Sequence, residues 1–344
     1  MTTAVSPPST SVPSAGISSK PAYEIPSVQQ IRAISSNGLK LASLFSGCGG
    51  SCLGFRMLGF DVVYANEFIP AARDTYRANY PETFLDPRDV RAVHASDITA
   101  AAKGAQIDVL EGSPPCAAFS TAGVREKGWS EVRSYSDTKQ RVDDLFFEFA
   151  RILRELQPRA FVAENVAGLV VGNAKGYFLQ ILDTLKSCGY RVEARVLDSQ
   201  WLGVPQHRRR LIFVGAREDL RVTPKLPKPL AYRYTLDEVL PDLARVNLSG
   251  RPDNWQSCIG RTMPTIVASS AATSPTAYFS AAFVETRAGE RRRLTIEEVK
   301  LLSTFPHDFR LTGTFEQQWE RVARAVPPIM MRSVASCVEE MLCH

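Results

Sequence analysis

The sequence lacks three features that would mark a membrane, secreted or metal-stabilised protein. No apolar run approaches the roughly 20 residues that a membrane helix needs. The N-terminus has no basic stretch followed by an apolar one, as a secretory signal would. The seven cysteines form neither a Cys-x-x-Cys pair nor a Cys/His metal spacing, which argues against a disulfide framework or a zinc site. We therefore expect a cytoplasmic protein with reduced thiols, no membrane association and no metal.

Composition and length indicate a globular chain with more than one structural unit. The 344 residues are 44% hydrophobic and 22% charged, which is ordinary globular usage, and they suffice for a large domain carrying a smaller one. Residues 1–38 are rich in Ser, Pro and Thr and poor in large apolar side chains, so we expect a disordered tail. Residues 221–293 hold eleven Lys/Arg against six Asp/Glu, an excess equal to the whole net charge of +5. A solvated surface would explain that excess, and so would a polyanionic partner.

Short apolar runs alternate with longer amphipathic stretches from residue 41 onward, whereas residues 221–290 lose this alternation and gain Pro, Arg and Ser/Thr. The alternation predicts an α/β fold, a mostly parallel sheet with helices on both faces. Helical patterning returns at 296–302 and 322–342. The predicted strands are the runs Leu41–Phe45, Val62–Ala65, Ile107–Leu110, Ala160–Ala163 and Leu211–Val214.

A glycine-rich turn follows the first predicted strand. The residues Phe45-Ser46-Gly47-Cys48-Gly49-Gly50 depart from Gly-x-Gly-x-x-Gly, because Cys52 occupies the place of the third glycine. This departure disfavours a pyrophosphate dinucleotide and favours a different adenosyl ligand. Glu67 ends the second strand, where an acidic side chain in such folds hydrogen-bonds ribose hydroxyls.

Three more segments place reactive side chains at strand ends. Cys116 follows two prolines after the third apolar run, which suits a rigidly held nucleophile, although a lone cysteine is more often structural. Glu164 closes the fourth run, where it could donate a proton or simply cap the strand. Gln206, Arg208 and Arg210 alternate before the fifth run and therefore project from one face.

Taken in order, these segments resemble the DNA cytosine-5 methyltransferases, of the bacterial or phage restriction-modification type. The resemblance covers about residues 41–339. It departs at Ala117, where the family usually has Gln, and at Ala323-Arg324, where it usually has Gly-Asn. The motifs that carry it are Leu44-Phe45-Ser46-Gly47, Pro114-Pro115-Cys116, Phe119-Ser120-Thr121-Ala122-Gly123, Glu164-Asn165-Val166, Gln206-x-Arg208-x-Arg210, Arg292-Arg293-Leu294-Thr295 and Phe305-Pro306.

The resemblance implies a Rossmann-like S-adenosylmethionine-dependent catalytic domain (39–220 plus 316–344) and a small target-recognition domain (221–315). It implies that Cys116 attacks ring carbon 6 of a flipped cytosine, that Glu164 protonates or hydrogen-bonds ring nitrogen 3, and that Arg208 and Arg210 hold the base and its loop. Cofactor contacts are implied for Phe45, Ser46, Gly47, Gly49, Gly50, Glu67, Asp97, Ile98 and Pro114.

These assignments predict a monomeric enzyme that methylates cytosine in a specific double-stranded DNA sequence, with or without a cognate restriction endonuclease. Two alternatives stay open. One is a tRNA cytosine-5 methyltransferase of the same fold, and the other is a catalytically silent nucleic-acid-binding homologue. The silent homologue would more naturally have lost Cys116 or Glu164, and both are present.

Overall fold

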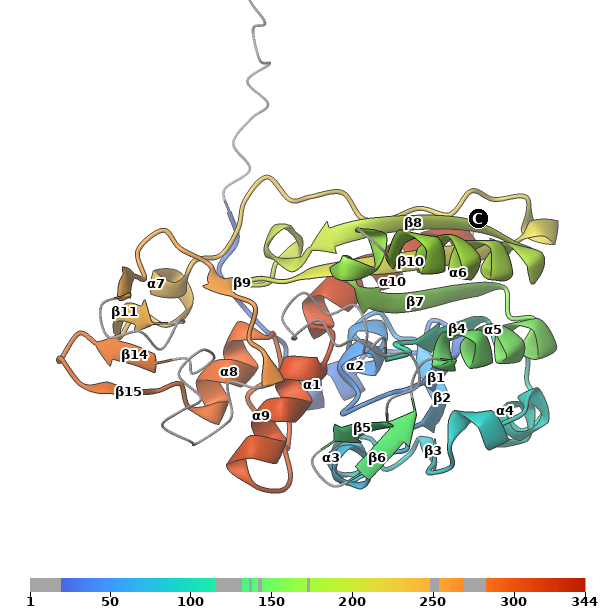
Figure 1. Ribbon diagram of the computed structural model, residues 1–344, viewed down its shortest axis with the longest axis horizontal. Helices are drawn as coiled ribbons and strands as arrows, with labels where there is room; N and C mark the ends of the chain where they lie inside the picture. Colours follow the sequence, from blue (N-terminus) through green and yellow to red (C-terminus); the bar gives the residue numbers. More distant parts are fainter. Residues whose placement is uncertain are drawn as a thin grey trace, which may run out of the picture.

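The computed structural model describes residues 20–115, 132–135, 138–141, 144–171, 174–247, 254–268 and 283–343. Within these ranges the chain forms a seven-stranded sheet with the order β3-β2-β1-β4-β7-β10-β8 (Figure 1). β10 runs antiparallel to both of its neighbours, and the other pairs are parallel. The strands are β1 Lys40–Leu44, β2 Asp61–Asn66, β3 Phe84–Asp86, β4 Val109–Gly112, β7 Ala160–Val166, β8 Tyr190–Asp198 and β10 Arg209–Arg217.

The five predicted apolar runs correspond to β1, β2, β4, β7 and β10. Successive side chains along these strands enter opposite cores: Leu41 and Val162 lie in one, and Ala42 and Phe161 lie in the other. A strand buried on both faces reads as a continuous apolar run, which is why the sequence signals these strands clearly. The predicted α/β fold with a mostly parallel sheet is confirmed.

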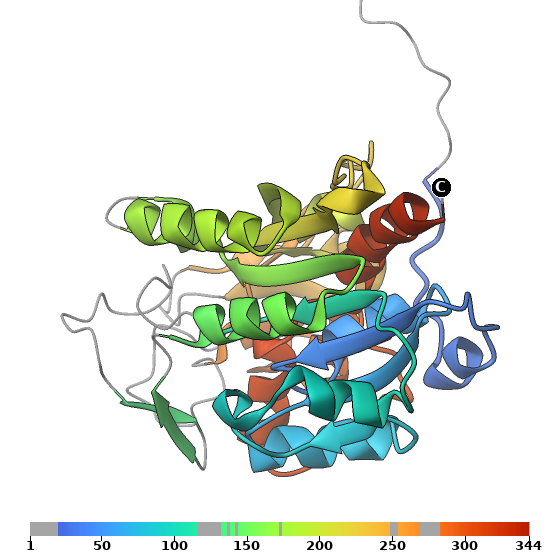
Figure 2. The same cartoon turned by 90° about the vertical axis from the view of Figure 1, so that its right-hand side faces the viewer.

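Helices cover both faces of this sheet (Figures 1 and 2). Apolar side chains of α2 and α10 join one core, and those of α4, α5 and α6 join the other. Gly54 lets α2 approach α10, because a Cβ at this position would lie 2.6 Å from the carbonyl oxygen of Pro328. The large-domain helices are α2 Gly50–Arg56, α3 Pro70–Asn79, α4 Ala95–Ala101, α5 Leu145–Leu156, α6 Lys175–Ser187 and α10 Pro328–Leu342.

A smaller antiparallel sheet, β12-β11-β14-β15, lies to one side of the large one (Figure 1). A separate small unit in this part of the chain agrees with the prediction, while its limits at residues 221 and 315 stay a prediction. Two short strands, β9 and β13, pair in parallel and join the units. The elements here are β9 Gln206–His207, α7 Leu236–Val239, β11 Leu243–Asn247, β12 Gln256–Ser257, β13 Met263–Pro264, β14 Phe283–Thr286, β15 Arg291–Arg293, α8 Ile296–Leu302 and α9 Phe315–Arg324.

The N-terminal segment differs from the expectation of disorder, because residues 20–38 have defined structure. Ser27 caps α1 (Val28–Arg32) through a capping box, and Val28 and Ile31 are buried. The Tyr23 hydroxyl donates to the carbonyl of Leu301, and the Tyr23 ring packs against Tyr234 at 4.9 Å between centroids. The segment therefore contacts residues almost three hundred positions away.

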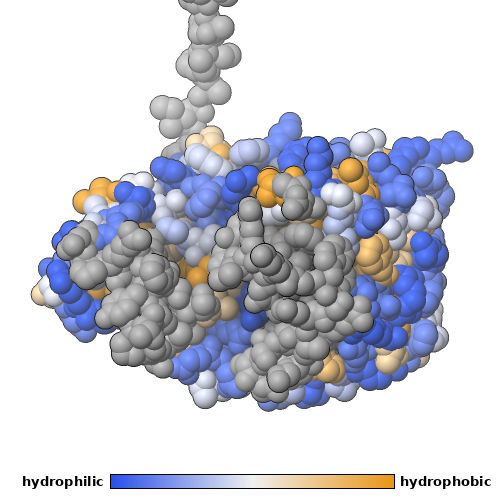
Figure 3. Space-filling model, in the orientation of Figure 1, coloured by the Kyte–Doolittle hydropathy of each residue, from blue (hydrophilic) through white to orange (hydrophobic). Residues whose placement is uncertain are grey.

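Hydrophilic side chains cover most of the face visible in Figure 3, outside the residues in grey. Every helix in the described part of the chain is too short or too polar to cross a bilayer.

A hairpin of β5 Val132–Tyr135 and β6 Thr138–Arg141 follows β4 in the chain. The order of the strands reverses between β1 and β4, and α/β proteins bind their ligands at the carboxyl ends of strands at such a point.

Candidate active site

The turn after β1 has a backbone that favours glycine. Gly47 and Gly49 have φ angles of 56° and 89°, in the left-handed region. Phe45 has a φ of 56°, which is rare for a bulky residue and typical of strain at functional sites. Apart from Gly47 itself and its two neighbours in the chain, no described residue has an atom within 4 Å of the position that a Cβ of Gly47 would occupy. The turn therefore leaves open space where a ligand can approach the backbone.

Glu67 lies directly after β2, and its carboxylate links the ends of two strands. One oxygen accepts a hydrogen bond from the Gly47 amide and the other accepts one from the Ile69 amide, both at 2.7 Å. Burial raises the pKa of Glu67, and these two hydrogen bonds act in the opposite direction. Glu67 thus fixes the glycine turn from the neighbouring strand, and its role toward ribose stays a prediction.

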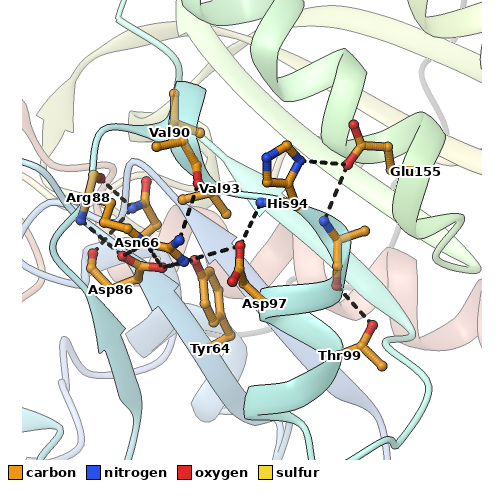
Figure 4. Close-up of polar contacts among 12 residues, drawn as sticks. Tyr64, Asn66, Asp86, Arg88, Val90, Val93, His94, Asp97, Thr99 and Glu155 are labelled. Atoms are coloured by element: carbon orange, nitrogen blue, oxygen red, sulfur yellow. Dashed lines mark hydrogen bonds and ion pairs between the residues drawn. The ribbon is translucent and has the colours of Figure 1, made fainter.

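The next strand end, after β3, carries a separate polar cluster (Figure 4). The Asp86 carboxylate accepts from the Tyr64 hydroxyl at 2.9 Å and from Arg88 at 2.6 Å. Burial raises the pKa of Asp86, but the hydrogen bonds from Arg88 and Tyr64 outweigh burial and keep the pKa below its usual value. The backbone carbonyl of Asp86 also accepts from the Glu67 amide at 3.1 Å, which connects this cluster to the first strand ends.

Asp97 and Ile98 lie in the first turn of α4 rather than directly at a strand end. The Asp97 carboxylate accepts from the His94 amide at 2.9 Å and pairs with Arg88 at 3.1 Å (Figure 4). Ile98 is buried in the core. Arg88 therefore bridges Asp97 to Asp86, and the predicted adenine contact of this pair stays a prediction.

Glu164 and Arg210 meet at the carboxyl end of β7. The Arg210 Nε atom lies 2.7 Å from Glu164 Oε1, and the two side chains are 15% and 12% exposed. Burial lowers the pKa of the Arg210 guanidinium, and Glu164 raises it. Two predicted catalytic side chains thus form one charged pair that is mostly shielded from water.

Arg208 lies beside this pair, and the alternation predicted for residues 206–210 is observed. Gln206 and Arg208 are buried, whereas His207 and Arg209 are exposed. Arg208 Nη1 donates to the carbonyl of Ile266 at 3.4 Å, and its Nε and Nη2 have no hydrogen-bond partner among the described residues. Burial, and then the charge of Arg210, lower the pKa of Arg208 well below its usual value. A buried guanidinium with unused donors is suited to an anionic or carbonyl ligand.

Cys116 lies outside the described residues, and the chain leading to it is placed as far as Pro115. The carbonyl of Pro114 accepts from the Asn165 side-chain amide at 3.3 Å, so the segment before Cys116 lies against the end of β7.

Burial raises the pKa of Cys48 to about 12 and that of Cys52 to about 11. Thiols that hold their protons so firmly are poor nucleophiles.

Glu111 is a buried acid near the glycine turn that the sequence did not indicate. It lies on β4 next to Ser43 of β1 and is fully buried, and the Ser43 hydroxyl donates to its carboxylate at 2.6 Å. The Ser46 hydroxyl in turn lies 3.0 Å from Ser43 Oγ, so a polar chain connects Glu111 to the glycine turn. Burial raises the pKa of Glu111 to about 7. The run Ile107–Leu110 directly before it indicates burial of this strand, but nothing local predicts a buried acid.

Residues 39–259 match the family of C-5 cytosine-specific DNA methylases. This chain belongs to that family.

The relatives of this C-5 cytosine methylase include Type II methyltransferases from several bacteria. M.NgoPII of Neisseria gonorrhoeae is 34% identical over 222 residues, 63% of this chain and 61% of that protein. M1.HphI of Haemophilus parahaemolyticus is 28% identical over 88% of this chain and 87% of its own. M.BsuFI of Bacillus subtilis is 30% identical over 89% of this chain and 74% of its own.

Solved structures share the fold of this methylase. A putative DNA modification methyltransferase encoded within an E. coli prophage superposes with a TM-score of 0.69 at 21% identity, covering 89% of this chain and 100% of that one. S. pombe Dnmt2 superposes with a TM-score of 0.63 at 15% identity, covering 89% and 99%. At these identities the likeness concerns the fold.

Proposed function

We propose that this C-5 cytosine methylase transfers a methyl group from S-adenosylmethionine to carbon 5 of cytosine in duplex DNA. The observation that carries the proposal is the shielded Glu164–Arg210 pair, 2.7 Å apart, at the end of β7. The segment that leads to Cys116 lies against the same strand end through Pro114 and Asn165. An acid, a cation and the approach to a cysteine thus converge where the fold binds ligands.

The residues of the glycine turn fit the cofactor that this family uses. The open side of Gly47 admits a ligand, and the Glu67 carboxylate stands one strand away, where it can accept hydrogen bonds from hydroxyl groups. In this proposal Phe45 packs on the adenine ring of the cofactor, and Ser46 and Pro114 contribute to the same binding site. S-adenosylmethionine supplies an electrophilic methyl group on a sulfonium when it is bound.

The side chains of this chain make the target carbon reactive. The Cys116 thiolate adds to ring carbon 6 and forms a carbon–sulfur bond, while Glu164 shares a proton with ring nitrogen 3 and relieves the negative charge on the ring. Carbon 5 then has the electron density to take the methyl group, and S-adenosylhomocysteine is the product left behind. Water accepts the proton from carbon 5, the electrons of that bond re-form the double bond between carbons 5 and 6 and expel the cysteine thiolate, and the proton shared with ring nitrogen 3 returns to Glu164.

Arg210 orients Glu164 through its Nε atom, and the unused donors of Arg208 suit the carbonyl oxygen of the base. The target atom is stacked inside a duplex, so the base has to be flipped out at a cost of a few kcal/mol. The basic excess in 221–293 supports phosphate contacts by the small unit. The relatives M.NgoPII and M1.HphI are Type II methyltransferases. This supports a role for this chain together with a restriction endonuclease that recognises the same DNA sequence.

Transfer of tritiated methyl groups from S-adenosylmethionine tests the proposal. We expect the full chain to label duplex DNA and to leave tRNA unlabelled. Label in tRNA alone would replace the DNA substrate with RNA. Label in neither, from protein whose binding of S-adenosylhomocysteine has been demonstrated, would support the silent homologue and contradict the proposed activity.

A further inference from the structure

The C-terminal end of α9 lies directly against the glycine turn. The Cys48 thiol lies 3.6 Å from the carbonyl oxygen of Arg321 and donates to it. A Cβ added to Gly50 would lie 2.6 Å from the carbonyl oxygen of Val326 and 3.1 Å from the Cβ of Ala325. The turn and the end of α9 therefore form one packed unit, although they are far apart in the sequence.

The Arg321 side chain is buried in this unit and uses few of its hydrogen-bond donors. Its side chain is 5% exposed, and Nε and Nη2 make no hydrogen bond within the ranges that the structure describes. Nη2 lies 2.9 Å from Glu320 Oε2, but Glu320 also pairs with Arg324 at 2.7 Å. Leaving donors of a buried guanidinium unused is costly, so a further acceptor is expected here.

The positive charge of Arg321 acts on Glu67 and on Cys48 of the glycine turn. Burial raises the pKa values of Glu67 and Cys48, and the positive charge of Arg321 lowers both. Glu67 does not supply the missing acceptor, because neither Nε nor Nη2 of Arg321 makes a hydrogen bond to it. A positive guanidinium thus stands next to the turn without a full set of protein partners.

We propose that Arg321 binds the carboxylate of the amino-acid end of S-adenosylmethionine. The inference rests on the proposed function for the identity of the ligand. Glu67 suits the ribose hydroxyls of that ligand, while its carboxylate needs a cation, and a guanidinium matches a carboxylate in charge and shape. Arg321 is a buried cation beside the turn, and its positive charge acts on Glu67.

Calorimetry with two ligands tests this assignment without any methyl transfer. The ligands are S-adenosylmethionine and its decarboxylated analogue, which lacks only the carboxylate. We expect R321Q to bind S-adenosylmethionine about 10- to 100-fold more weakly, as for the loss of a charged hydrogen bond. The affinity of R321Q for the decarboxylated analogue should stay within about twofold of wild type, because this analogue lacks the carboxylate that Arg321 is proposed to bind. R321K should recover part of the loss.

R332Q is the matched control, because Arg332 is an exposed arginine on the next helix. Circular dichroism and thermal unfolding of R321Q report whether the variant folds, and R321K provides a milder change if it does not. Equal weakening of both ligands, or no change for either, would overturn the assignment of Arg321 while leaving the proposed cofactor in place. A wild-type protein that binds neither ligand would overturn the cofactor itself and this inference with it.

Discussion

The Arg210 guanidinium lies 2.7 Å from the Glu164 carboxylate because β7 and β10 run antiparallel. Glu164 faces Ile212 in this ladder, so Arg210, two residues before Ile212, projects from the same side of the sheet. β10 is the strand that breaks the parallel order of the sheet. Its reversal brings an arginine to the strand end where the other site residues lie.

Glu164→Gln should lower the rate of methyl transfer by about 10²- to 10⁴-fold, the usual contribution of a general acid. Binding of S-adenosylhomocysteine should not change, because Glu164 lies on β7 and the cofactor turn follows β1. Single-turnover kinetics on duplex DNA measure the rate. Glu193→Gln is the control, since Glu193 pairs with Arg195 on the surface at 46% exposure. A Glu164→Gln rate equal to that of the control would remove Glu164 from the mechanism.

Glu67→Gln should weaken cofactor binding by about 1–3 kcal/mol, because the carboxylate is a stronger acceptor than an amide oxygen and holds the Gly47 amide. Titration calorimetry with S-adenosylhomocysteine gives the affinity. Glu82→Gln, at an acid that is 52% exposed, serves as the control. Unchanged affinity in Glu67→Gln would count against the ribose assignment.

The Glu111 carboxyl should make stability depend on pH. Burial raises its pKa from 4.5 to about 7 in the folded chain, so the folded state holds the proton more firmly than the unfolded state. The contribution of Glu111 to the free energy of unfolding is complete below pH 4.5 and is lost as the pH rises through 7. The total decrease is about 3 kcal/mol. Glu111→Gln should therefore gain stability relative to wild type between pH 5 and pH 8, as measured by urea unfolding. Parallel pH profiles for the two proteins would show that Glu111 does not titrate in this range.

Residues 221–290 should choose the DNA sequence. The basic excess of residues 221–293 and the separate sheet that this part of the chain forms indicate a surface that is independent of the chemistry. Replacing the segment with that of a related methylase should redirect the methylated site without changing the reaction. Bisulfite sequencing of DNA exposed to the chimera identifies the site, and retention of the original site would place recognition elsewhere.

Single arginines in this small unit should then fall into two groups. Arg291 is 61% exposed, and its Nε pairs with Glu285 at 2.7 Å. Replacing an exposed arginine that contacts phosphate should weaken binding to all sequences and lower the salt dependence of binding. Replacing an arginine that contacts a base edge should weaken binding by about 1–3 kcal/mol and relax the sequence requirement at one position of the site. Arg292 differs from Arg291, because its side chain is only 29% exposed and two of its nitrogens lie 2.8 Å from the Glu298 carboxylate.

The sequence predicted the parts of the fold that depend on continuous burial. β1, β7 and β10 are buried on both faces and appear as apolar runs. β3 has three residues, one of them the exposed Phe84, and β8 is only partly buried along most of its length, so neither has a clear signal. The predicted helical stretch 322–342 is in fact two helices, α9 and α10, separated at Pro327.

Long-range contacts explain what the sequence could not predict about the site and the tail. Glu111 is buried because β4 lies at the centre of the sheet, and Arg321 is buried because α9 packs on a turn far away in the chain. Tyr23 belongs to a Ser/Pro-rich segment, yet it orders against Tyr234 and Leu301. Composition indicates how much apolar surface a segment can bury by itself, and it does not indicate which distant residues the segment packs against.

The most direct test of the proposed chemistry is a covalent trap. Duplex DNA with 5-fluorocytosine at the target position cannot lose a proton from carbon 5, so the carbon–sulfur bond to the enzyme should persist. We expect a denaturation-resistant adduct that forms only with S-adenosylmethionine present, with peptide mass spectrometry placing the base on Cys116. Cys116→Ala should form none, while Cys343→Ser, at an exposed cysteine, should match wild type. An adduct on another residue, or none from a protein that methylates ordinary cytosine, would contradict the mechanism.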